Sequence, residues 1–234
     1  MDAGQVALLR EVLAGTEWLE ATRRFAGSLR AAVRPHGGGL LLVGSERYEP
    51  WHLAAHLADE AAWSGLPELS PTLVRHHVPA GAPDHLAVDL TRLERAGRRD
   101  TVLVVAPEPP CGGLLERVHD ARRSGATVLT LDGAGSPADP GPDPTGGVSG
   151  PGAAAPVPPP GTGPVTSAGF AELRALAHDT LTAEDSGLAF DAVQHLVSAA
   201  AGEERLPGPR GRRRLRDRLS RLADQLTAPP PARW

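Results

Sequence analysis

Residues 39–63, GLLLVGSERYEPWHLAAHLADEAAW, decide the fold of this chain. Residues 40–43 form a short unbroken apolar run that stops at a glycine, which is typical of a strand buried on both faces of a parallel sheet. Residues 45–49 are polar, and Pro50 suits the first position of a helix, where the N–H that proline lacks would have no partner. A buried strand, a polar loop and a helix N-terminus make the usual ligand-binding corner of an α/β sheet.

The helix predicted after this loop, ending near Ser64 with Gly65 as a left-handed cap, has two different faces. One face carries residues spaced to pack on the sheet: Leu53, Leu57 and Ala61. The other carries a stripe at steps of three and four: Glu49, His52, His56, Asp59 and Trp63. Since His52 and His56 lie one turn apart, both imidazoles could reach one ligand or one zinc-like divalent metal ion. A partly exposed polar face, or a helix buried against a partner, is the more common reason for such a stripe.

Composition limits the function classes. The 234 residues suffice for one α/β domain with extensions, and an apolar fraction of 41% supports a core. A net charge of −4 argues against a general nucleic-acid binder. The single cysteine excludes an internal disulfide and a cysteine-based zinc cage. The sequence shows no signal peptide and no membrane-spanning apolar run, so we expect a cytoplasmic protein that does not enter a membrane.

Strands and helices alternate after the first corner. The expected strands are residues 73–78, 100–106 and 126–131. The expected helices are residues 85–96, with Asp84 as a cap, and residues 114–124. This rhythm predicts a doubly wound parallel sheet in a three-layer αβα arrangement, Rossmann-like or flavodoxin-like, with four or five strands. The fifth strand is open because a Gly/Pro-rich segment stands where it is expected.

Composition divides the chain into four segments. They are an α/β core with N-terminal helices, a disordered insertion, further helices of the same domain, and a basic amphipathic helix with a loose tail: residues 1–132, 133–167, 168–206 and 207–234. The insertion has too few large apolar side chains to offset the entropy of ordering it. The third segment predicts two helices, residues 168–181 and 183–202. The leucine stripe of the last helix fits an exposed or dimerising helix, although its arginines could also contact phosphates of a nucleic acid.

The order of these elements resembles the SIS (sugar isomerase) domain family. The resemblance rests on LLLVGS with its helix, on TVLVVA with the helix that ends in RRSGATVLTL, and on the late helix FDAVQHLVSAA. It implies a SIS-like α/β fold and binding of a sugar derivative. It also implies assembly into a homodimer or homotetramer with sites at subunit contacts.

The loop that binds a phosphate in the SIS family departs from the family pattern here. The family loop reads roughly S-x-S-G-x-S/T and holds the phosphate with hydroxyls and with backbone N–H groups at a helix N-terminus. In this chain the hydroxyl positions fall on Ala106, Glu108 and Cys111. Glu108 would repel a phosphate, which leaves the amides of Gly112 and Gly113 and the Cys111 thiol as donors. The thiol could also be a nucleophile at a helix N-terminus, or an incidental small residue.

The histidines carry the second part of the resemblance. Sedoheptulose-phosphate isomerases of the family have a Gly-rich turn ending in Ser and then H-x-x-x-E. Gly44, Ser45 and His52 match this pattern, whereas His56 stands where the family has its glutamate base. His195 resembles a family histidine that serves as acid, base or metal ligand, and it fits a polar residue at a dimer contact equally well.

Two functions follow from the resemblance. One is a module that binds a sugar derivative, or acts in regulation or structure, without turnover. The other is an isomerase-type enzyme of altered specificity that uses His52, His56 and His195, with His56 and His195 catalytic and with or without a metal. Whether His195 lies close to His52 and His56 distinguishes the two.

Overall fold

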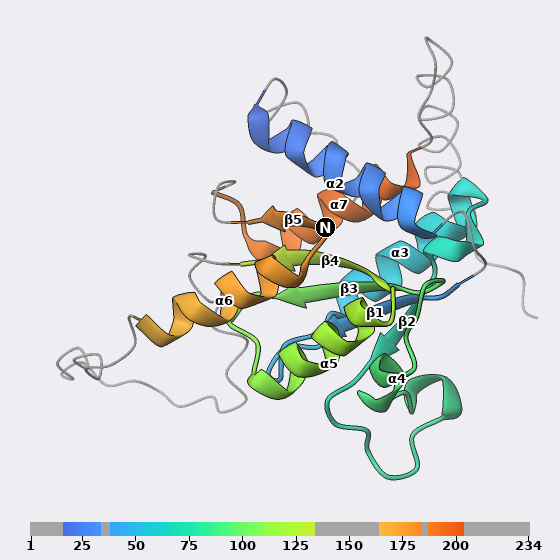
Figure 1. The fold of residues 1–234 in the computed structure, drawn as a ribbon. Helices are drawn as coiled ribbons and strands as arrows, with labels where there is room; N and C mark the ends of the chain where they lie inside the picture. The colour runs from blue at the N-terminus through green and yellow to red at the C-terminus, as the bar shows by residue number, and fades with distance from the viewer. Residues whose placement is uncertain (1–15, 34–37, 134–163, 184–186, 204–234) are drawn as a thin grey trace, which may run out of the picture.

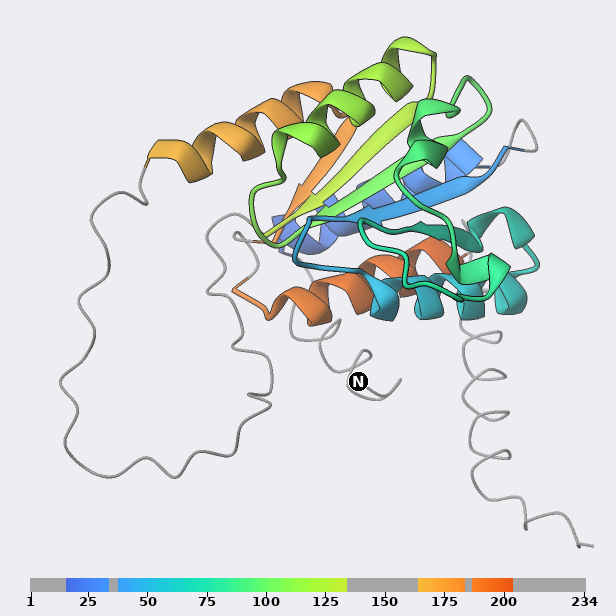
Figure 2. The same ribbon diagram turned by 90° about the horizontal axis from the view of Figure 1, so that it is seen from below.

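The computed structural model describes residues 16–33, 38–133, 164–183 and 187–203. Its centre is a five-stranded, all-parallel sheet in the order β2-β1-β3-β4-β5. The strands are β1 (Leu40–Gly44), β2 (Pro71–Val74), β3 (Thr101–Ala106), β4 (Thr127–Asp132) and β5 (Asp179–Thr182). Helices cover both faces of the sheet, as Figures 1 and 2 show. The predicted three-layer α/β fold is therefore confirmed, with five strands rather than four.

Each face of the sheet is covered by its own set of helices (Figure 2). One set is α2 (Glu17–Val33), α3 (Trp51–Ser64) and α7 (Phe190–Gly202), and the other is α4 (Thr91–Glu94), α5 (Gly112–Arg123) and α6 (Pro164–Leu176). Alternate strand residues point to opposite faces, so Leu40 and Leu42 join the core under the first set while Leu41 and Val43 join the core under the second. This two-sided burial explains why the strand has no polar residue.

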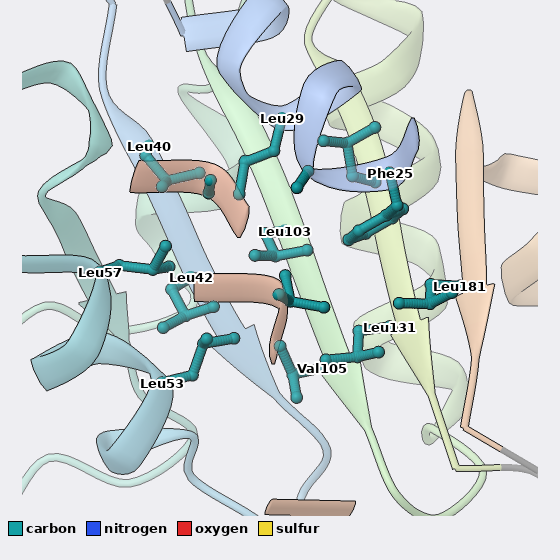
Figure 3. Close-up of a cluster of buried hydrophobic side chains, with 14 of the residues drawn as sticks. Phe25, Leu29, Leu40, Leu42, Leu53, Leu57, Leu103, Val105, Leu131 and Leu181 are labelled. Carbon is teal, nitrogen blue, oxygen red and sulfur yellow. The ribbon is translucent and has the colours of Figure 1, made fainter. Parts of the chain in front are cut away.

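The first core confirms the predicted inner face of α3. Leu53 and Leu57 are fully buried and Ala61 is nearly so. Figure 3 shows Leu53 and Leu57 beside Leu42 of β1, with Phe25 of α2 packed over the other end of the sheet. Gly65 adopts φ 69° after the helix, the left-handed conformation expected of a glycine cap.

The fifth strand lies where the sequence predicted a helix over residues 168–181. Helix α6 ends at Leu176, and residues 179–182 instead pair with β4, beginning with Leu129 opposite Asp179. The strand is short and polar, and Leu181 is its one buried residue, so no apolar run marks it. The helix predicted from residue 183 begins only at Phe190.

The prediction of one helix over residues 85–96 is also wrong. Only a single 3-10 turn, Asp84–Leu86, and the four-residue α4 form there, and Asp84 lies inside the turn rather than capping a helix. The reason is a long-range contact: the backbone N–H of Arg75 donates to the carbonyl of Val88, which draws this segment alongside the end of β2. For the same reason β2 ends at Val74 instead of Val78.

Part of the sequence analysis falls outside the described residues. The predicted insertion, residues 133–167, is described only at Gly133 and from Pro164, where α6 begins. Residues 1–15 of the predicted N-terminal helices lie outside the description altogether, as does the predicted basic helix of residues 207–234. None of the helices in the described ranges has the length and apolar character needed to cross a bilayer.

Candidate functional site

The strand order reverses between β1 and β3, and ligands of open α/β sheets bind at such a reversal, beyond the carboxyl ends of the strands. Gly44 at the end of β1 lies opposite Val105 of β3. Ser45 follows Gly44 and is buried, and its hydroxyl donates to Glu108 Oε1 at 3.1 Å. The structure therefore brings together two of the predicted ligand-binding residues, Ser45 and Glu108, from the loops after β1 and β3.

The loop after β3 leads into α5 two residues earlier than the sequence predicted. Cys111 is the N-cap residue with an extended backbone, and its side chain makes no capping hydrogen bond. The thiol packs against the aliphatic core beneath α5, which is an ordinary position for a small apolar side chain. Gly112 is exposed, and the space where its Cβ would lie has no neighbour within 4 Å. The amide end of α5, which includes Gly113, is thus open, but Glu108 stands in the loop before it.

Three histidines converge where α3, the helix after the β1 loop, packs against α7. We call His52, His56 and His195 the three-histidine centre. One ring nitrogen from each lies within 4.8 Å of the others, and His52 Nε2 is 2.6 Å from His195 Nε2. The ring centroids are 4.1 to 4.7 Å apart. His195 therefore meets both α3 histidines within one subunit.

The centre has a buried wall and an open side. His195 is only 4% exposed because α7 packs against both α2 and α3 over the sheet, so that residues 192–198 are all buried. His56 is half-buried and His52 is exposed. The exposed side of the centre is therefore formed by His52.

Burial and the neighbouring rings lower the pKa of His195 and of His56, which favours their neutral forms. Burial and, to a smaller extent, the neighbouring His56 and His52 together lower the pKa of His195 to about 4. Burial also lowers the pKa of His56, with a contribution from His52 that Asp59 partly opposes. A neutral imidazole is the form that binds a metal ion. A group with a pKa near 4 is, in contrast, a poor general base at pH 7, since an effective base has a pKa close to the working pH.

The geometry fits a divalent ion. Zinc–nitrogen bonds of 2.0–2.1 Å in a tetrahedral site place the ligand nitrogens about 3.3 Å from one another. His52 and His195 would therefore have to move apart by less than about 1 Å, and nitrogens as far as 4.8 Å apart would have to approach by about 1.5 Å, which requires side-chain rotation. Three histidines from two packed helices leave one coordination position for water or an oxygen ligand.

The loop after β1 is tied to α7 beside the centre. Gln194 Nε2 donates to the Tyr48 hydroxyl at 2.8 Å, and the Tyr48 ring meets Phe190 edge-on at 5.9 Å. Burial raises the pKa of Tyr48 to about 12, so its hydroxyl stays protonated. On α7 itself, the Ser198 hydroxyl donates to the backbone carbonyl of His195. Sequence reasoning missed Tyr48 and Gln194; the one available signal was a glutamine beside His195 on a helix otherwise rich in apolar residues.

A second group that sequence reasoning missed is centred on Arg75, the residue after β2. Its Nε donates to both carboxylate oxygens of Glu49 at 3.1 Å, and its guanidinium lies 5.1 Å from the centre of the Trp51 ring. Trp51 Nε1 also donates to Glu49, at 2.8 Å. Glu49 was in the predicted polar stripe with His52 and His56, but it binds Arg75 and Trp51 instead.

Comparison with known proteins gives a fold likeness only. No protein-family model matches the chain, and no curated protein matches its sequence. Its fold is similar to that of a proposed sugar-binding protein from Salmonella typhimurium LT2, with a TM-score of 0.44 and 18% identity over 95% of this chain and 54% of that chain. It is also similar to the Vibrio vulnificus NanR protein complexed with ManNAc-6P, with a TM-score of 0.42 and 13% identity over 97% of this chain and 69% of that chain. The chain thus spans about half the length of the first of these proteins, and its chemistry has to be argued from its own side chains.

Proposed function

We propose that this protein binds a zinc-like divalent ion at the three-histidine centre and, through that ion, a sugar derivative without a phosphate group. The observation that carries the proposal is the convergence of one nitrogen each from His52, His56 and His195 within 4.8 Å. The resemblance to the SIS family supplies the class of small molecule.

The protonation state of the centre supports a metal ligand role over a role in proton transfer. With a pKa near 4, His195 is neutral at pH 7 without help from a metal, so binding an ion there displaces almost no proton. The coordination position left by three histidines suits a hard or borderline oxygen ligand. The hydroxyl and carbonyl oxygens of a sugar are ligands of this kind.

The loop after β3 supports a ligand without phosphate. Ala106 offers no donor, and the carboxylate of Glu108 accepts the Ser45 hydroxyl that could otherwise have served a ligand. A phosphate placed at the open amides of Gly112 and Gly113 would approach this carboxylate, and two like charges at contact range repel by about 1 kcal/mol even in water.

A second function is an isomerase-type enzyme, for which a close approach of His195 to His52 and His56 was expected; these residues do lie close together. His56 is the better candidate for moving a proton, since it is half-buried and has the carboxylate of Asp59 opposing the fall in its pKa. Turnover would appear as solvent deuterium incorporated next to the carbonyl of an aldose or ketose. It should be lost in His56→Gln.

Metal analysis of the protein purified without chelators tests the main proposal, followed by calorimetric titration of the chelator-treated protein with zinc. We expect one zinc per chain, with binding lost in His56→Ala and in His195→Ala. His77→Ala is the matched control, because His77 is an exposed histidine in the loop after β2. Circular dichroism establishes that the variants fold. A wild-type protein that binds no zinc, or a His77→Ala variant that loses it as His56→Ala does, would overturn the proposal.

A further inference from the structure

Trp51 is an exposed indole that is nevertheless held in place. It is 42% exposed, and it and Trp63 are the two exposed large apolar residues in the described part of the chain. Its Nε1 donates to Glu49 Oε2, and the Arg75 guanidinium lies over its ring at 5.1 Å. Since Arg75 also binds Glu49 through Nε and through Nη2, at 3.1 Å, the three side chains brace one another.

Trp63 shows that these contacts are not a general property of exposed tryptophans here. It lies on the same helix, three turns further on, and is 56% exposed. Within the described ranges no ion pair, ring contact or hydrogen bond fixes its indole as Glu49 and Arg75 fix that of Trp51. The braced ring is therefore specific to the end of α3 that lies at the carboxyl edge of the sheet.

Trp51 is also adjacent to the three-histidine centre. It directly precedes His52, so the two Cα atoms are about 3.8 Å apart. Their side chains leave α3 about 100° apart, and both lie on its exposed side. A ligand that contacts both would have to extend around the exposed side of α3, from the imidazoles to the indole.

We propose that Trp51 is the stacking platform for the pyranose ring of the ligand, a subsite distinct from the metal ligands; its place beside the centre rests on the proposed function. One face of a pyranose presents C–H groups with a partial positive charge, and the face of an indole is negative. Stacking also removes exposed apolar area of Trp51 from water. Because Glu49 and Arg75 already order the ring, little conformational entropy is lost on binding.

The charge of this edge favours a neutral or amino-bearing pyranose. Three carboxylates lie in these loops, those of Glu46, Glu49 and Glu108, against the guanidinium groups of Arg47 and Arg75. Their net charge is negative, which does not attract an anion. A nucleobase could stack on an indole as well, and a second copy of the chain could cover it. The experiment has to separate these two occupants from a pyranose.

The test uses the full-length protein labelled with 5-fluorotryptophan, whose Trp51 resonance is assigned with Trp51→Phe. Methyl β-D-glucopyranoside and methyl β-D-galactopyranoside are titrated with and without zinc, and adenosine is titrated separately. We expect at least one glycoside to shift the Trp51 resonance and leave that of Trp63 in place. Trp51→Ala should weaken glycoside binding about tenfold, the lower end of the effect of removing an aromatic stacking partner, with zinc affinity unchanged. The matched control Trp63→Ala should change neither.

The outcomes separate this subsite from the proposed function. No shift of the Trp51 resonance with either glycoside would overturn the platform, as would a shift with adenosine alone. A change of oligomeric state in Trp51→Ala with glycoside binding intact would assign the ring to a subunit contact and also overturn it. A Trp51 shift in a protein that binds no zinc would support the platform and contradict the metal proposal. Zinc binding without any Trp51 shift would support the metal proposal and contradict the platform.

Discussion

The loops after β1 and β3 leave neighbouring strands at the same edge of the sheet and each leads into a helix, yet they differ in chemistry. The first leads into α3, which carries His52 and His56 and packs against α7 with His195. The second leads into α5, which packs against α4 and α6 and follows its N-cap residue Cys111, which packs on an apolar core. Both are favourable locations for a ligand. The difference shows that the neighbouring helix, rather than the corner alone, decides whether reactive side chains meet.

The buried residues of the two helices show the same contrast. The buried side of α7 includes Gln194, His195 and Ser198, whereas the buried residues of α5 are all aliphatic, among them Leu114 and Val118. Buried polar groups are costly unless they are hydrogen-bonded, and those of α7 have partners: Gln194 donates to Tyr48, and Ser198 donates to the carbonyl of His195. This polar network on α7 has no counterpart among the buried residues of α5.

The largest expected difference between the two loops is how each tolerates a side chain at its glycine, Gly44 or Gly112. A Cβ at Gly44 would lie 1.7 Å from the Tyr48 carbonyl oxygen, whereas one at Gly112 would meet nothing within 4 Å. We expect Gly44→Ala to lower the free energy of unfolding by about 3 kcal/mol or more, because the loop after β1 must move. Gly112→Ala, the control in the other loop, should be neutral or stabilise by up to about 1 kcal/mol through helix propensity. Urea unfolding measures both, and equal effects would show that the first loop is as tolerant as the second.

The next largest expected effect is the loss of folding stability at acidic pH that the burial of His195 on α7 causes. The pKa of His195 falls from 6.5 in the unfolded chain to about 4 in the fold. Between these values the unfolded state takes up a proton that the folded state refuses, so stability decreases as the pH falls below 6.5. The loss should reach about 2–3 kcal/mol at pH 4.5 in chelator.

This loss is measured by urea unfolding at pH 7 and pH 4.5. His195→Gln should lack this part of the pH dependence, and His77→Gln should keep it. Identical pH profiles for His195→Gln and the parent would show that the burial of His195 does not control acid stability.

The loop after β3 should gain phosphate binding when hydroxyl groups are placed in it. Ala106→Ser, Glu108→Ser and Cys111→Ser together restore hydroxyls, remove the carboxylate and free the Ser45 hydroxyl from its bond to Glu108. Each charge-assisted hydrogen bond gained by a phosphate should contribute roughly 1.5–3 kcal/mol.

Calorimetry with glucose 6-phosphate tests this recovery. We expect no binding by the parent at about millimolar ligand and measurable binding by the triple variant, with glucose as the matched ligand without phosphate. Tight binding of the phosphate by the parent would contradict the prediction. So would a folded triple variant that gains nothing.

The smallest expected effect concerns the link between the first loop and α7. Tyr48→Phe removes the hydroxyl that accepts from Gln194 and should cost about 1 kcal/mol of stability, the usual net contribution of one hydrogen bond. The Gln194 amide retains contact with Asp191 Oδ1 at 3.1 Å, which limits the loss. Urea unfolding gives the stability, and zinc titration shows whether the link also positions His195. An unchanged stability would mean that water replaces the bond at no cost.

Much of the fold follows from local sequence patterns. The apolar runs of β1, β3 and β4 and the two-faced α3 are visible in the sequence because each is long enough, or regular enough, to show its own periodicity. The pairing of His52 with His56 follows in the same way from their spacing of one helical turn. These elements could therefore be predicted without coordinates.

Only the tertiary structure decided the elements and contacts that depend on distant residues. The strand Asp179–Thr182 exists because β4 offers it an edge, and the loop around Val88 is extended because Arg75 binds it. His195 joins His52 across 143 positions of sequence, and Ser45 meets Glu108 across 63. The sequence alone determined which helices could carry imidazoles. The packing of α7 on α3 determined that three of them meet, because burial of their apolar faces, and not any local preference, sets the register between two helices.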